Sequence, residues 1–469
     1  MTIKFGTGGW RGIMGKEFTF HNLRLVVQAF SNFLKRKVKK DEITIALDYD
    51  SRFFSNRYAK EATRLFTLNG IRVLFPERDT PLPALAHKIV KNNLDGGMII
   101  TASNNPPLYN GVKIFSDNGA SLREKYVKEL EQEIRKIEND FRFVHRYPVS
   151  DLIQYRDFEE AYLNYLSSEI DKDIIKKRNL KVVVDPLYGS AREYIDKFFI
   201  ANELYVETIH NFRDPYFGGT LPIIKKENLS DLSKKIIETK SDMGIAVDLD
   251  GDRFGIIDET GRYIHPNIIL SLILNYLIEV KGLRGKIAKS IATSGLLSMI
   301  AKENNIEIVE TPVGAKYISE LITDGKVEFG AEQSAGFWYK PHLNEKDGIF
   351  GGLLVAEILS YYNRPLSQLI NTLFNRYKKV YPLDKNLIIN EKRVDKYNKF
   401  CDIKFKEIEG KKVKKVIKID GIKLIFNDDN WVLVRVSGNE PIIRFYSEGR
   451  NKKEAEVLLS GILKVFNNV

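Results

Sequence analysis

Apolar and polar positions are arranged in blocks that repeat three times along the chain. In each repeat a short apolar run is followed by a polar loop, a helical pattern and a second apolar run; the repeats occupy 43–75, 181–209 and 287–309. In the first repeat the helix is expected over 55–68, and in the second it is expected from residue 191. A strand, a helix and a strand joined by short loops favour a mostly parallel sheet. The pattern therefore predicts three related α/β domains.

The last hundred residues have a different pattern. After residue 373 the alternation of helix and strand fades, and a final amphipathic helix is expected over 452–466. Strands of an antiparallel sheet are expected at 413–419, 423–427, 431–436 and 442–446. Placing boundaries near 150, 257 and 370 divides the chain into domains 1–150, 151–257, 258–370 and 371–469, of which the last is α+β.

Composition is typical of a folded protein of several domains. The chain has 469 residues, 43% hydrophobic and 29% charged, which excludes global disorder. Cys401 is its one cysteine, so a disulfide framework or a multi-cysteine metal centre is excluded and a reducing compartment is favoured. The net charge of +11 is spread along the whole chain, with carboxylates interleaved, so we do not expect a nucleic-acid partner.

The most apolar stretch is too short to cross a membrane. It runs from 268 to 278 and is broken by Ser271 and Asn275, whereas a spanning helix needs about 20 residues. We expect it to form a buried helix. The N-terminal segment has no apolar targeting run, so a soluble, cytoplasmic protein without a membrane partner is predicted.

The loop at 101–113 presents a serine directly after a buried-strand pattern. Its sequence is Thr-Ala-Ser-Asn-Asn-Pro-Pro-Leu-Tyr-Asn-Gly-Val-Lys, with the hydroxyl of Ser103 near the tip of the strand. An exposed hydroxyl on a rigid loop suits a nucleophilic or phosphorylated serine, and Lys113 lies downstream as a candidate proton carrier. An ordinary Asn-Pro turn is the alternative.

Three aspartates alternate in a second loop, Val247-Asp-Leu-Asp-Gly-Asp-Arg-Phe254. In extended backbone Asp248, Asp250 and Asp252 point to one side, and three clustered carboxylates favour a bound cation, with oxygen ligands suited to Mg²⁺. Arg253 occupies the position where an EF-hand loop needs glycine. An Asp-x-Asp pair after a strand also fits a haloacid-dehalogenase phosphatase with Asp248 as the nucleophile, and a solvated acidic turn is a further alternative.

Two later loops carry groups that suit a sugar phosphate. Residues 330–337 (Gly-Ala-Glu-Gln-Ser-Ala-Gly-Phe) offer a carboxylate and a hydroxyl that can pair with sugar hydroxyls. Residues 435–444 (Arg-Val-Ser-Gly-Asn-Glu-Pro-Ile-Ile-Arg) combine two arginines, a serine, an amide and backbone N–H groups, which are the donors that a phosphate dianion needs. Taken alone, each is also compatible with a plain surface loop.

In this order the four loops resemble the α-D-phosphohexomutase family, which includes phosphoglucomutases and phosphomannomutases. The resemblance runs from residues 5–12 (Phe-Gly-Thr-Gly-Gly-Trp-Arg-Gly) to Arg444. It implies three α/β mixed-sheet domains and a C-terminal domain resembling the TATA-binding-protein fold, around a central cleft. It further implies that Ser103 is a phosphoserine that transfers the phosphoryl group, with Lys113 and Arg11 as further catalytic residues.

The resemblance also implies the remaining site residues. Mg²⁺ would be held by Ser103, Asp248, Asp250 and Asp252. The substrate would be bound by Arg253, Lys289, Gly314, Glu332, Ser334, His342 and Lys346. The non-transferring phosphate would be held by Arg435, Ser437, Gly438, Asn439 and Arg444.

Three positions depart from the family pattern. Asn104 replaces the histidine that usually follows the serine, so Lys113 becomes the stronger candidate for the acid or base. Asn439 replaces a threonine, and an amide can still donate to phosphate. The segment Phe217-Gly-Gly-Thr-Leu-Pro222 lacks the acidic residue that commonly follows its proline.

The predicted reaction is reversible phosphoryl transfer between the 1- and 6-positions of hexose phosphates. Glucose phosphate is the expected substrate, glucose 1,6-bisphosphate the expected intermediate or activator, and a monomer or homodimer the expected state. A phosphomannomutase or phosphoglucosamine mutase of the same family is the main alternative. A phosphatase, or an inactive sugar-phosphate-binding homologue, is a further one.

Overall fold

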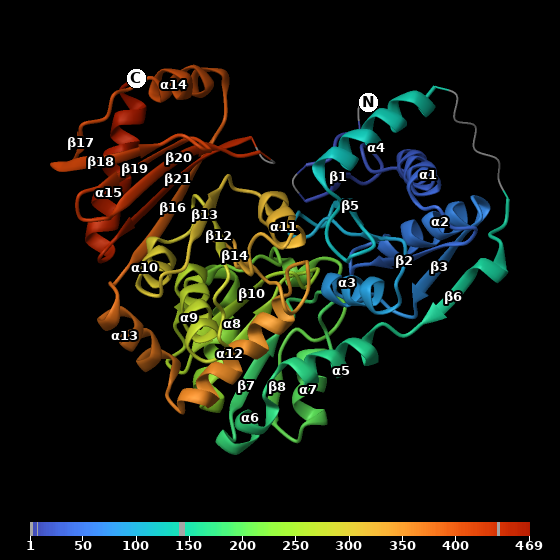
Figure 1. The fold of residues 1–469 in the computed structure, drawn as a ribbon, viewed down its shortest axis with the longest axis horizontal. Coiled ribbons are helices and arrows are strands. Elements are labelled where there is room, and N and C mark those ends of the chain that lie inside the picture. Colours follow the sequence, from blue (N-terminus) through green and yellow to red (C-terminus); the bar gives the residue numbers. More distant parts are fainter. Residues whose placement is uncertain (1–2, 7, 140–145, 439–440) are drawn as a thin grey trace.

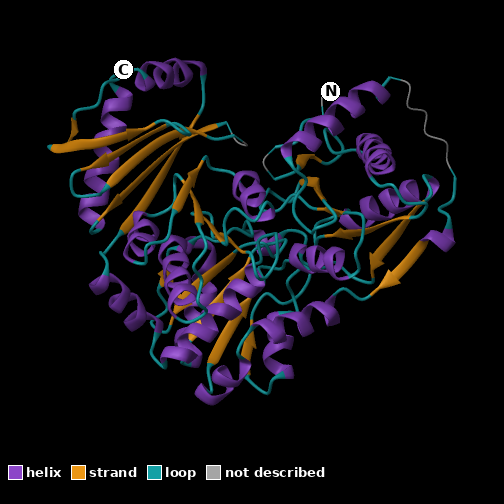
Figure 2. Ribbon diagram, in the orientation of Figure 1, coloured by secondary structure: helices purple, strands orange, loops and turns teal. Residues whose placement is uncertain are grey.

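The computed structural model describes residues 3–6, 8–139, 146–438 and 441–469, which form four domains in chain order (Figure 1). The first domain lies at the right (blue to cyan), the second at the bottom (green), the third next to it, and the fourth at the upper left (red). Helices cover the sheets of the first three domains, whereas the fourth is a curved sheet with its helices on one side (Figure 2). The expected fold, three α/β domains and a C-terminal α+β domain, is confirmed.

The first domain contains a six-stranded mixed sheet in the order β1-β5-β4-β2-β3-β6. Its strands are β1 (Trp10–Ile13), β2 (Ile43–Tyr49), β3 (Ile71–Pro76), β4 (Gly97–Ile100), β5 (Tyr109–Phe115) and β6 (Ile153–Arg156). Its helices are α1 (Phe20–Lys37), α2 (Ser55–Leu68), α3 (Leu82–Lys91) and α4 (Glu124–Ile137). β1 and β5 are antiparallel to their neighbours, and the other pairs are parallel. β6 lies beyond residue 150 and still pairs with β3.

The second domain has a five-stranded sheet in the order β11-β10-β9-β7-β8. Its strands are β7 (Lys181–Asp185), β8 (Tyr205–Thr208), β9 (Met243–Val247), β10 (Phe254–Asp258) and β11 (Tyr263–Ile264). Its helices are α5 (Glu159–Glu169), α6 (Lys172–Arg178), α7 (Ile195–Ala201) and α8 (Ser230–Thr239). α7 begins four residues later than expected, because Glu193 has a left-handed φ of 66° that an α-helix does not allow.

The third domain has a four-stranded sheet in the order β13-β12-β14-β15. Its strands are β12 (Ile287–Ser290), β13 (Ile308–Thr311), β14 (Phe329–Glu332) and β15 (Gly336–Tyr339). Its helices are α9 (Pro266–Glu279), α10 (Gly295–Glu303), α11 (Ala315–Thr323), α12 (Gly348–Tyr362) and α13 (Leu366–Arg376). α9 contains the apolar stretch 268–278 and is almost entirely buried, as expected.

The fourth domain is a six-stranded antiparallel sheet in the order β16-β21-β20-β19-β18-β17. Its strands are β16 (Tyr381–Ile388), β17 (Glu407–Ile408), β18 (Lys411–Ile417), β19 (Ile422–Phe426), β20 (Trp431–Val436) and β21 (Ile442–Gly449). Its helices are α14 (Glu391–Cys401) and α15 (Lys452–Asn467). Four strands and α15 match the expected elements, whereas β16 and β17 were not anticipated, since neither has a run of buried apolar residues.

The distribution of buried apolar residues shows how firmly the domains are joined. One continuous cluster links the second and third domains, with α9 and α12 packed between their sheets. The first and fourth domains each have a main core of their own. Because cores of this kind resist deformation, the second and third domains pack as one unit, and a smaller apolar cluster with Ile291 and Trp431 joins the third domain to the fourth. Within the described residues, no helix combines the length and the apolarity needed to cross a bilayer.

Candidate active site

Ser103 lies on the loop after β4 and is fully buried among charged side chains, not exposed as expected from the sequence. Its φ of 48° is left-handed, and the Oγ1 of Thr101 accepts a hydrogen bond from its backbone N–H at 2.9 Å. Its hydroxyl donates to Asp250 Oδ1 at 3.0 Å and accepts from Arg253 Nη2 at 2.6 Å. A non-glycine residue in the left-handed conformation is strained and must be held by its surroundings. Strained residues of this kind are concentrated at functional sites.

That support comes largely from Arg52, which the sequence analysis did not single out. The guanidinium of Arg52 is fully buried and donates to the backbone carbonyls of Ser103, Asn105, Pro106 and Tyr109. Burial lowers its pKa to about 10, against the partly compensating charge of a neighbouring carboxylate, Asp50, whose Oδ2 lies 3.3 Å from the Arg52 Nε. The signal in the sequence was the polar segment Asp-Ser-Arg directly after the strand at 43–49.

Asp248, Asp250 and Asp252 converge in the turn between β9 and β10. One carboxylate oxygen from each lies within 4.8 Å of the others, and all three residues are buried. The convergence comes from a turn rather than from the alternation expected of extended backbone: Gly251 N–H donates to the carbonyl of Asp248 at 3.0 Å, and Gly251 has a φ of 80°. A Cβ at Gly251 would lie 2.6 Å from Pro81, so the turn also needs glycine for close packing.

Three cations surround this carboxylate cluster. Lys113 Nζ lies 2.6 Å from Asp250 Oδ2 and 3.2 Å from Asp252 Oδ2, and Lys346 Nζ lies 2.8 Å from Asp252 Oδ2. Arg253 Nε lies 2.8 Å from Asp248 Oδ2. Burial and the two neighbouring carboxylates raise the pKa of Asp248 to about 7, against the opposing charge of Arg253. For Asp252 burial is outweighed by Lys113 and Lys346, which hold its pKa well below its usual range.

The donor set fits a hard divalent cation. Carboxylate oxygens, with a serine oxygen beside them, are the ligands that Mg²⁺ prefers over the nitrogen and sulfur ligands typical of zinc. Burial is the main cause of the raised pKa of Asp248, and a bound cation would favour the charged form of this carboxylate. Among the described residues, Asp248, Asp250 and Asp252 form the group of three or more acidic, histidine or cysteine side chains that lie close enough together to hold a metal ion.

Asn104 connects three loops at this point. Its amide is assigned with the nitrogen toward Asp248 Oδ2 (3.3 Å) and the carbonyl of Pro222 (2.8 Å), because this orientation gives each polar atom a complementary partner. The oxygen then accepts from Arg253 Nη2 at 2.9 Å and Nη1 at 3.1 Å. The segment 217–222 also places the ring of Phe217 5.1 Å from the guanidinium carbon of Arg52. This segment therefore packs against the serine loop and helps to hold it.

Arg11 and the expected sugar-binding residues lie on separate elements. Arg11 on β1 donates from Nη1 to Asn105 Oδ1 at 2.7 Å, beside the serine loop. Glu332 at the end of β14 is buried, and its Oε1 accepts the backbone N–H of Gly314 at 3.1 Å; burial raises its pKa. Ser334 is exposed in the turn between β14 and β15.

Lys289 and His342 are both engaged inside the protein. Lys289 on β12 donates to the carbonyl of Ser294 at 3.1 Å and pairs with Glu310 Oε1 at 3.2 Å. The Nε2 of His342 lies 2.8 Å from Asp347 Oδ2, and its ring stacks on Phe350 with centroids 3.9 Å apart. Both side chains are buried; Lys289 Nζ and His342 Nε2 have protein partners, whereas His342 Nδ1 is buried without a hydrogen bond.

The phosphate loop lies at the end of the fourth sheet. Arg435 on β20 is opposite Arg444 on β21, and the backbone N–H of Ser437 donates to the carbonyl of Ile442 at 2.9 Å. The Nε of Arg435 donates to Asp420 Oδ2 at 2.8 Å. Gly438 has open space around its Cα. Asn439, the remaining residue expected here, lies outside the described residues.

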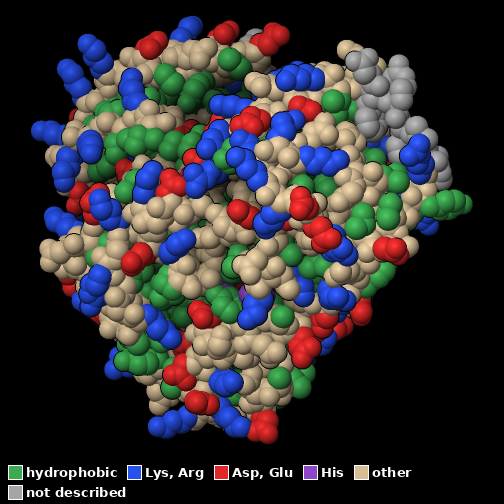
Figure 3. All heavy atoms as spheres, turned by 45° about the vertical axis from the view of Figure 1, so that its right-hand side comes forward, with side chains coloured by type: hydrophobic (Ala, Val, Ile, Leu, Met, Phe, Trp, Pro, Cys, Tyr) green, Lys and Arg blue, Asp and Glu red, His purple; other side chains and the backbone are tan. Residues whose placement is uncertain are grey.

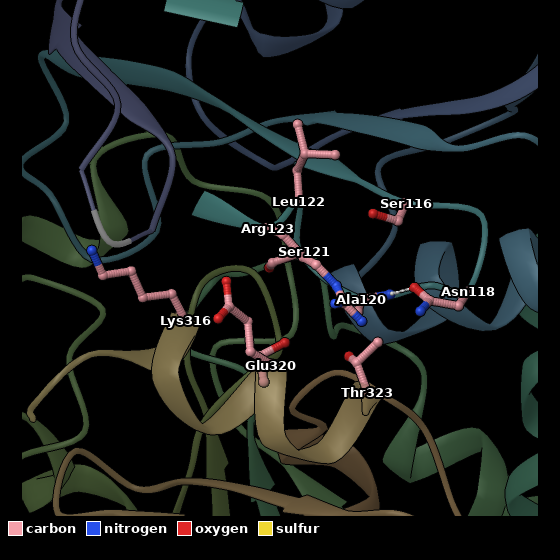
Figure 4. Close-up of a pocket in the computed structure, with 10 residues that line it drawn as sticks. Ser116, Asn118, Ala120, Ser121, Leu122, Arg123, Lys316, Glu320 and Thr323 are labelled. Carbon is pink, nitrogen blue, oxygen red and sulfur yellow. Dashed lines mark hydrogen bonds between the residues drawn. The ribbon is translucent and has the colours of Figure 1, made fainter. Parts of the chain in front are cut away.

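The surface view shows a patch of mixed charge on one face of the protein. Lys and Arg side chains gather with acidic ones at the upper centre of the face drawn in Figure 3. A separate small cavity of about 20 Å³ lies where residues 116–123 meet α11, and it is lined by Arg123, Lys316 and Glu320 among others (Figure 4). That volume holds water rather than a sugar phosphate, so the carboxylate cluster and the phosphate loop remain the candidate site.

The four domains and the serine and aspartate loops define the phosphohexomutase class of enzyme. Models of the phosphoglucomutase/phosphomannomutase family match every domain: α/β/α domain I at 2–141, domain II at 160–261, domain III at 265–377 and the C-terminal domain at 389–464. The chain belongs to this family.

Relatives and solved structures agree along the whole chain. A "Phosphoglucomutase/phosphomannomutase" from Thermococcus kodakarensis is 31% identical, covering 97% of this chain and 96% of that protein. A "Phosphoglucosamine/phosphogalactosamine mutase" from Sulfurisphaera tokodaii is 29% identical, covering 98% of both. A crystal structure from Thermus thermophilus, assigned to the phosphomannomutases, has a TM-score of 0.87 at 25% identity and covers 100% of this chain and 99% of its own.

Proposed function

We propose that this phosphohexomutase moves a phosphoryl group between the 1- and 6-positions of a hexose phosphate by way of a phosphorylated Ser103. The observation that carries this proposal is the contact of the Ser103 hydroxyl with both Asp250 Oδ1 (3.0 Å) and Arg253 Nη2 (2.6 Å). A nucleophile placed between a carboxylate cluster and a guanidinium suits phosphoryl transfer, which depends mainly on positioning and charge neutralisation. The family match supports the reaction class.

The chain's own residues account for both half-reactions. In the first, a hydroxyl of the sugar phosphate attacks the phosphorus on Ser103; a new P–O bond forms to the sugar, the bond to Ser103 Oγ breaks, and the hydroxyl's proton is transferred to Oγ. The product is a hexose 1,6-bisphosphate, expected to be glucose 1,6-bisphosphate, which turns end for end. In the second, Ser103 Oγ attacks the phosphorus of the other phosphate; a new P–O bond forms to Oγ, the bond to the sugar oxygen breaks, and the serine proton is transferred to that oxygen. Arg253 and Lys113 stabilise the charge on the phosphoryl oxygens.

Asp248, Asp250 and Asp252 would hold Mg²⁺ together with an oxygen on Ser103. When bound, the ion supplies positive charge at the transferred phosphoryl group. Arg435, Ser437, Gly438, Asn439 and Arg444 would hold the phosphate that is not being transferred, while Glu332 and Ser334 meet sugar hydroxyls. We retain Arg11 as a further catalytic residue. Substrate binding is retained for Lys289, Gly314, His342 and Lys346. A monomer or homodimer in the cytoplasm stays a prediction.

Glucose phosphate is the proposed substrate. The 330–337 loop lacks the histidine that closes it in many phosphoglucosamine and dual-specificity enzymes, and residues 345–348 (Glu-Lys-Asp-Gly) resemble phosphoglucomutases. Glucose and mannose phosphates differ at one hydroxyl, and a site that accepts both ends of its ligand can distinguish them only modestly, by about 10–200-fold. The second candidate is glucosamine phosphate, which the name of the Sulfurisphaera tokodaii relative favours.

The test is a coupled mutase assay with glucose 1-phosphate, mannose 1-phosphate and glucosamine 1-phosphate side by side, together with intact-mass analysis. We expect one phosphoryl group on a fraction of the purified protein, its loss in Ser103→Ala, and loss of nearly all turnover in that variant. Wild-type turnover by Ser103→Ala would overturn the mechanism. The fastest of the three sugars identifies the substrate.

A further inference from the structure

One carboxylate contacts both an arginine of the phosphate loop in the fourth domain and a turn of the third domain. Asp420 Oδ2 accepts hydrogen bonds from Arg435 Nε at 2.8 Å and from the backbone N–H of Val313 at 3.0 Å. Asp420 lies in the turn between β18 and β19, and Val313 lies in the turn between β13 and α11. One side chain therefore joins a residue expected to bind phosphate to a loop of the neighbouring domain.

The turn that carries Asp420 packs closely against β20, next to Arg435. The next residue, Gly421, has a φ of 81°, and a Cβ there would lie 2.2 Å from the carbonyl oxygen of Val434 and 2.7 Å from the Cβ of Arg435. Only glycine permits this approach. The turn is thus pressed directly against β20 beside Arg435, which is itself 6% exposed.

The connection continues toward the sugar-binding loop. Val313 N–H faces Asp420, and the next backbone N–H, that of Gly314, donates to Glu332 Oε1 at 3.1 Å. Two successive amides of one turn are therefore held by two carboxylates from different domains. An apolar cluster with Ile291 and Trp431 joins the two domains, and the Asp420 contact adds a direct polar link beside Arg435.

We propose that Asp420 is a positioning residue that fixes the guanidinium of Arg435 for the non-transferring phosphate and sets its place relative to Glu332. This rests on the proposed role of Arg435 in phosphate binding. A guanidinium held through Nε keeps a fixed plane and can still direct Nη donors at a phosphate, whereas an unheld arginine must lose side-chain freedom when the ligand binds. Asp420 touches no reacting atom, so its effect is on binding rather than on the chemical step.

The experiment measures glucose 1-phosphate affinity by calorimetry in a Ser103→Ala background, where the ligand is not turned over. Adding Asp420→Ala should weaken binding about 10- to 100-fold, the range expected for one charge-assisted hydrogen bond. Asp420→Asn keeps an acceptor oxygen and should recover part of the loss. Asp402→Ala, an exposed aspartate after α14 in the same domain, is the matched control and should leave binding unchanged.

A double-mutant cycle with Arg435→Ala separates positioning from a general structural role. Once Arg435 is absent, Asp420→Ala should cause no further loss of affinity, whereas damage to the whole domain would add to it. In the active enzyme, Asp420→Ala should raise KM and change kcat less than about threefold.

Unchanged or tighter binding by Asp420→Ala would overturn the inference, because it would mean that Arg435 needs no support or that Asp420 competes with phosphate. Additive losses in the cycle would overturn it as well. If the Ser103→Ala protein with Asp420 intact binds neither glucose 1-phosphate nor inorganic phosphate, the proposed function fails instead.

Discussion

Arg52 gives the sharpest test of how the Ser103 loop is held in place. Its buried guanidinium reaches four backbone carbonyls of that loop, at 2.5 Å for Ser103 and Asn105, 2.8 Å for Pro106 and 3.1 Å for Tyr109. No other side chain in the described hydrogen-bond network contacts the loop at so many points. Replacing the fork of donors by a single ammonium is therefore expected to release part of the loop.

The magnitude follows from the number of bonds that lysine cannot make. Arg52→Lys keeps the charge opposite Asp50, but its three donors share one nitrogen and cannot reach all four carbonyls. Each hydrogen bond to a charged group contributes about 1.5–3 kcal/mol, so losing one or two should lower the free energy of unfolding by about 2–4 kcal/mol. A shift of about 1 Å in a reacting group costs about 100-fold in rate, so kcat should fall by one to two orders of magnitude.

The assay compares wild type, Arg52→Lys and Arg57→Lys. Arg57 lies on the exposed face of α2, so its replacement makes the same chemical change without touching the serine loop. Denaturant unfolding gives stability, the coupled assay gives kcat, and intact mass gives the phosphorylated fraction of Ser103. Arg52→Ala is less informative, because leaving Asp50 buried without its cation costs about 3–5 kcal/mol and endangers folding. Wild-type kcat and stability in Arg52→Lys would refute the reasoning.

Four further predictions follow from the site and the core. Asp250→Asn should weaken activation by Mg²⁺, measured as a higher half-saturating concentration; activity indifferent to both chelator and added metal would count against the three-aspartate site. Asn104→Asp should lower kcat about tenfold more than Asn104→Ala, because it puts a negative charge where the amide nitrogen faces Asp248 at 3.3 Å; equal losses would argue against the bridge. His87 is buried with a pKa lowered by burial to about 4. Because the unfolded imidazole takes up its proton near pH 6.5, stability should fall as pH drops from about 6.5 toward 4, and His87→Phe should make that fall shallower in denaturant unfolding at about pH 7 and 4.5. Glucose 1-phosphate should react faster than mannose 1-phosphate, with glucosamine 1-phosphate slowest; a preference for glucosamine 1-phosphate would reverse the proposed specificity.

The order of the four loops along the chain was enough to predict the family and the fold. Apolar runs followed by helical patterns predicted β2, α2 and β3 to within a residue. Strands inside a parallel sheet read as continuous apolar runs and a helix on the sheet face reads as amphipathic, so both patterns are visible in the local sequence. The sequence by itself also indicated Ser103 and the three aspartates, since a hydroxyl and carboxylates placed after buried strands have few structural uses.

Contacts between distant segments were decided by the tertiary structure alone. Arg52 supports Ser103 from 51 residues away, and Asp420 reaches Val313 across 107 residues. The three aspartates converge through a turn that depends on Gly251 packing against Pro81, not through strand alternation. β16 was missed because its apolar residues do not form a regular or buried run, and its place is set by pairing with β21. Local patterns determine which segments form strands and helices, whereas long-range hydrogen bonds of buried polar groups depend on how those segments are brought together.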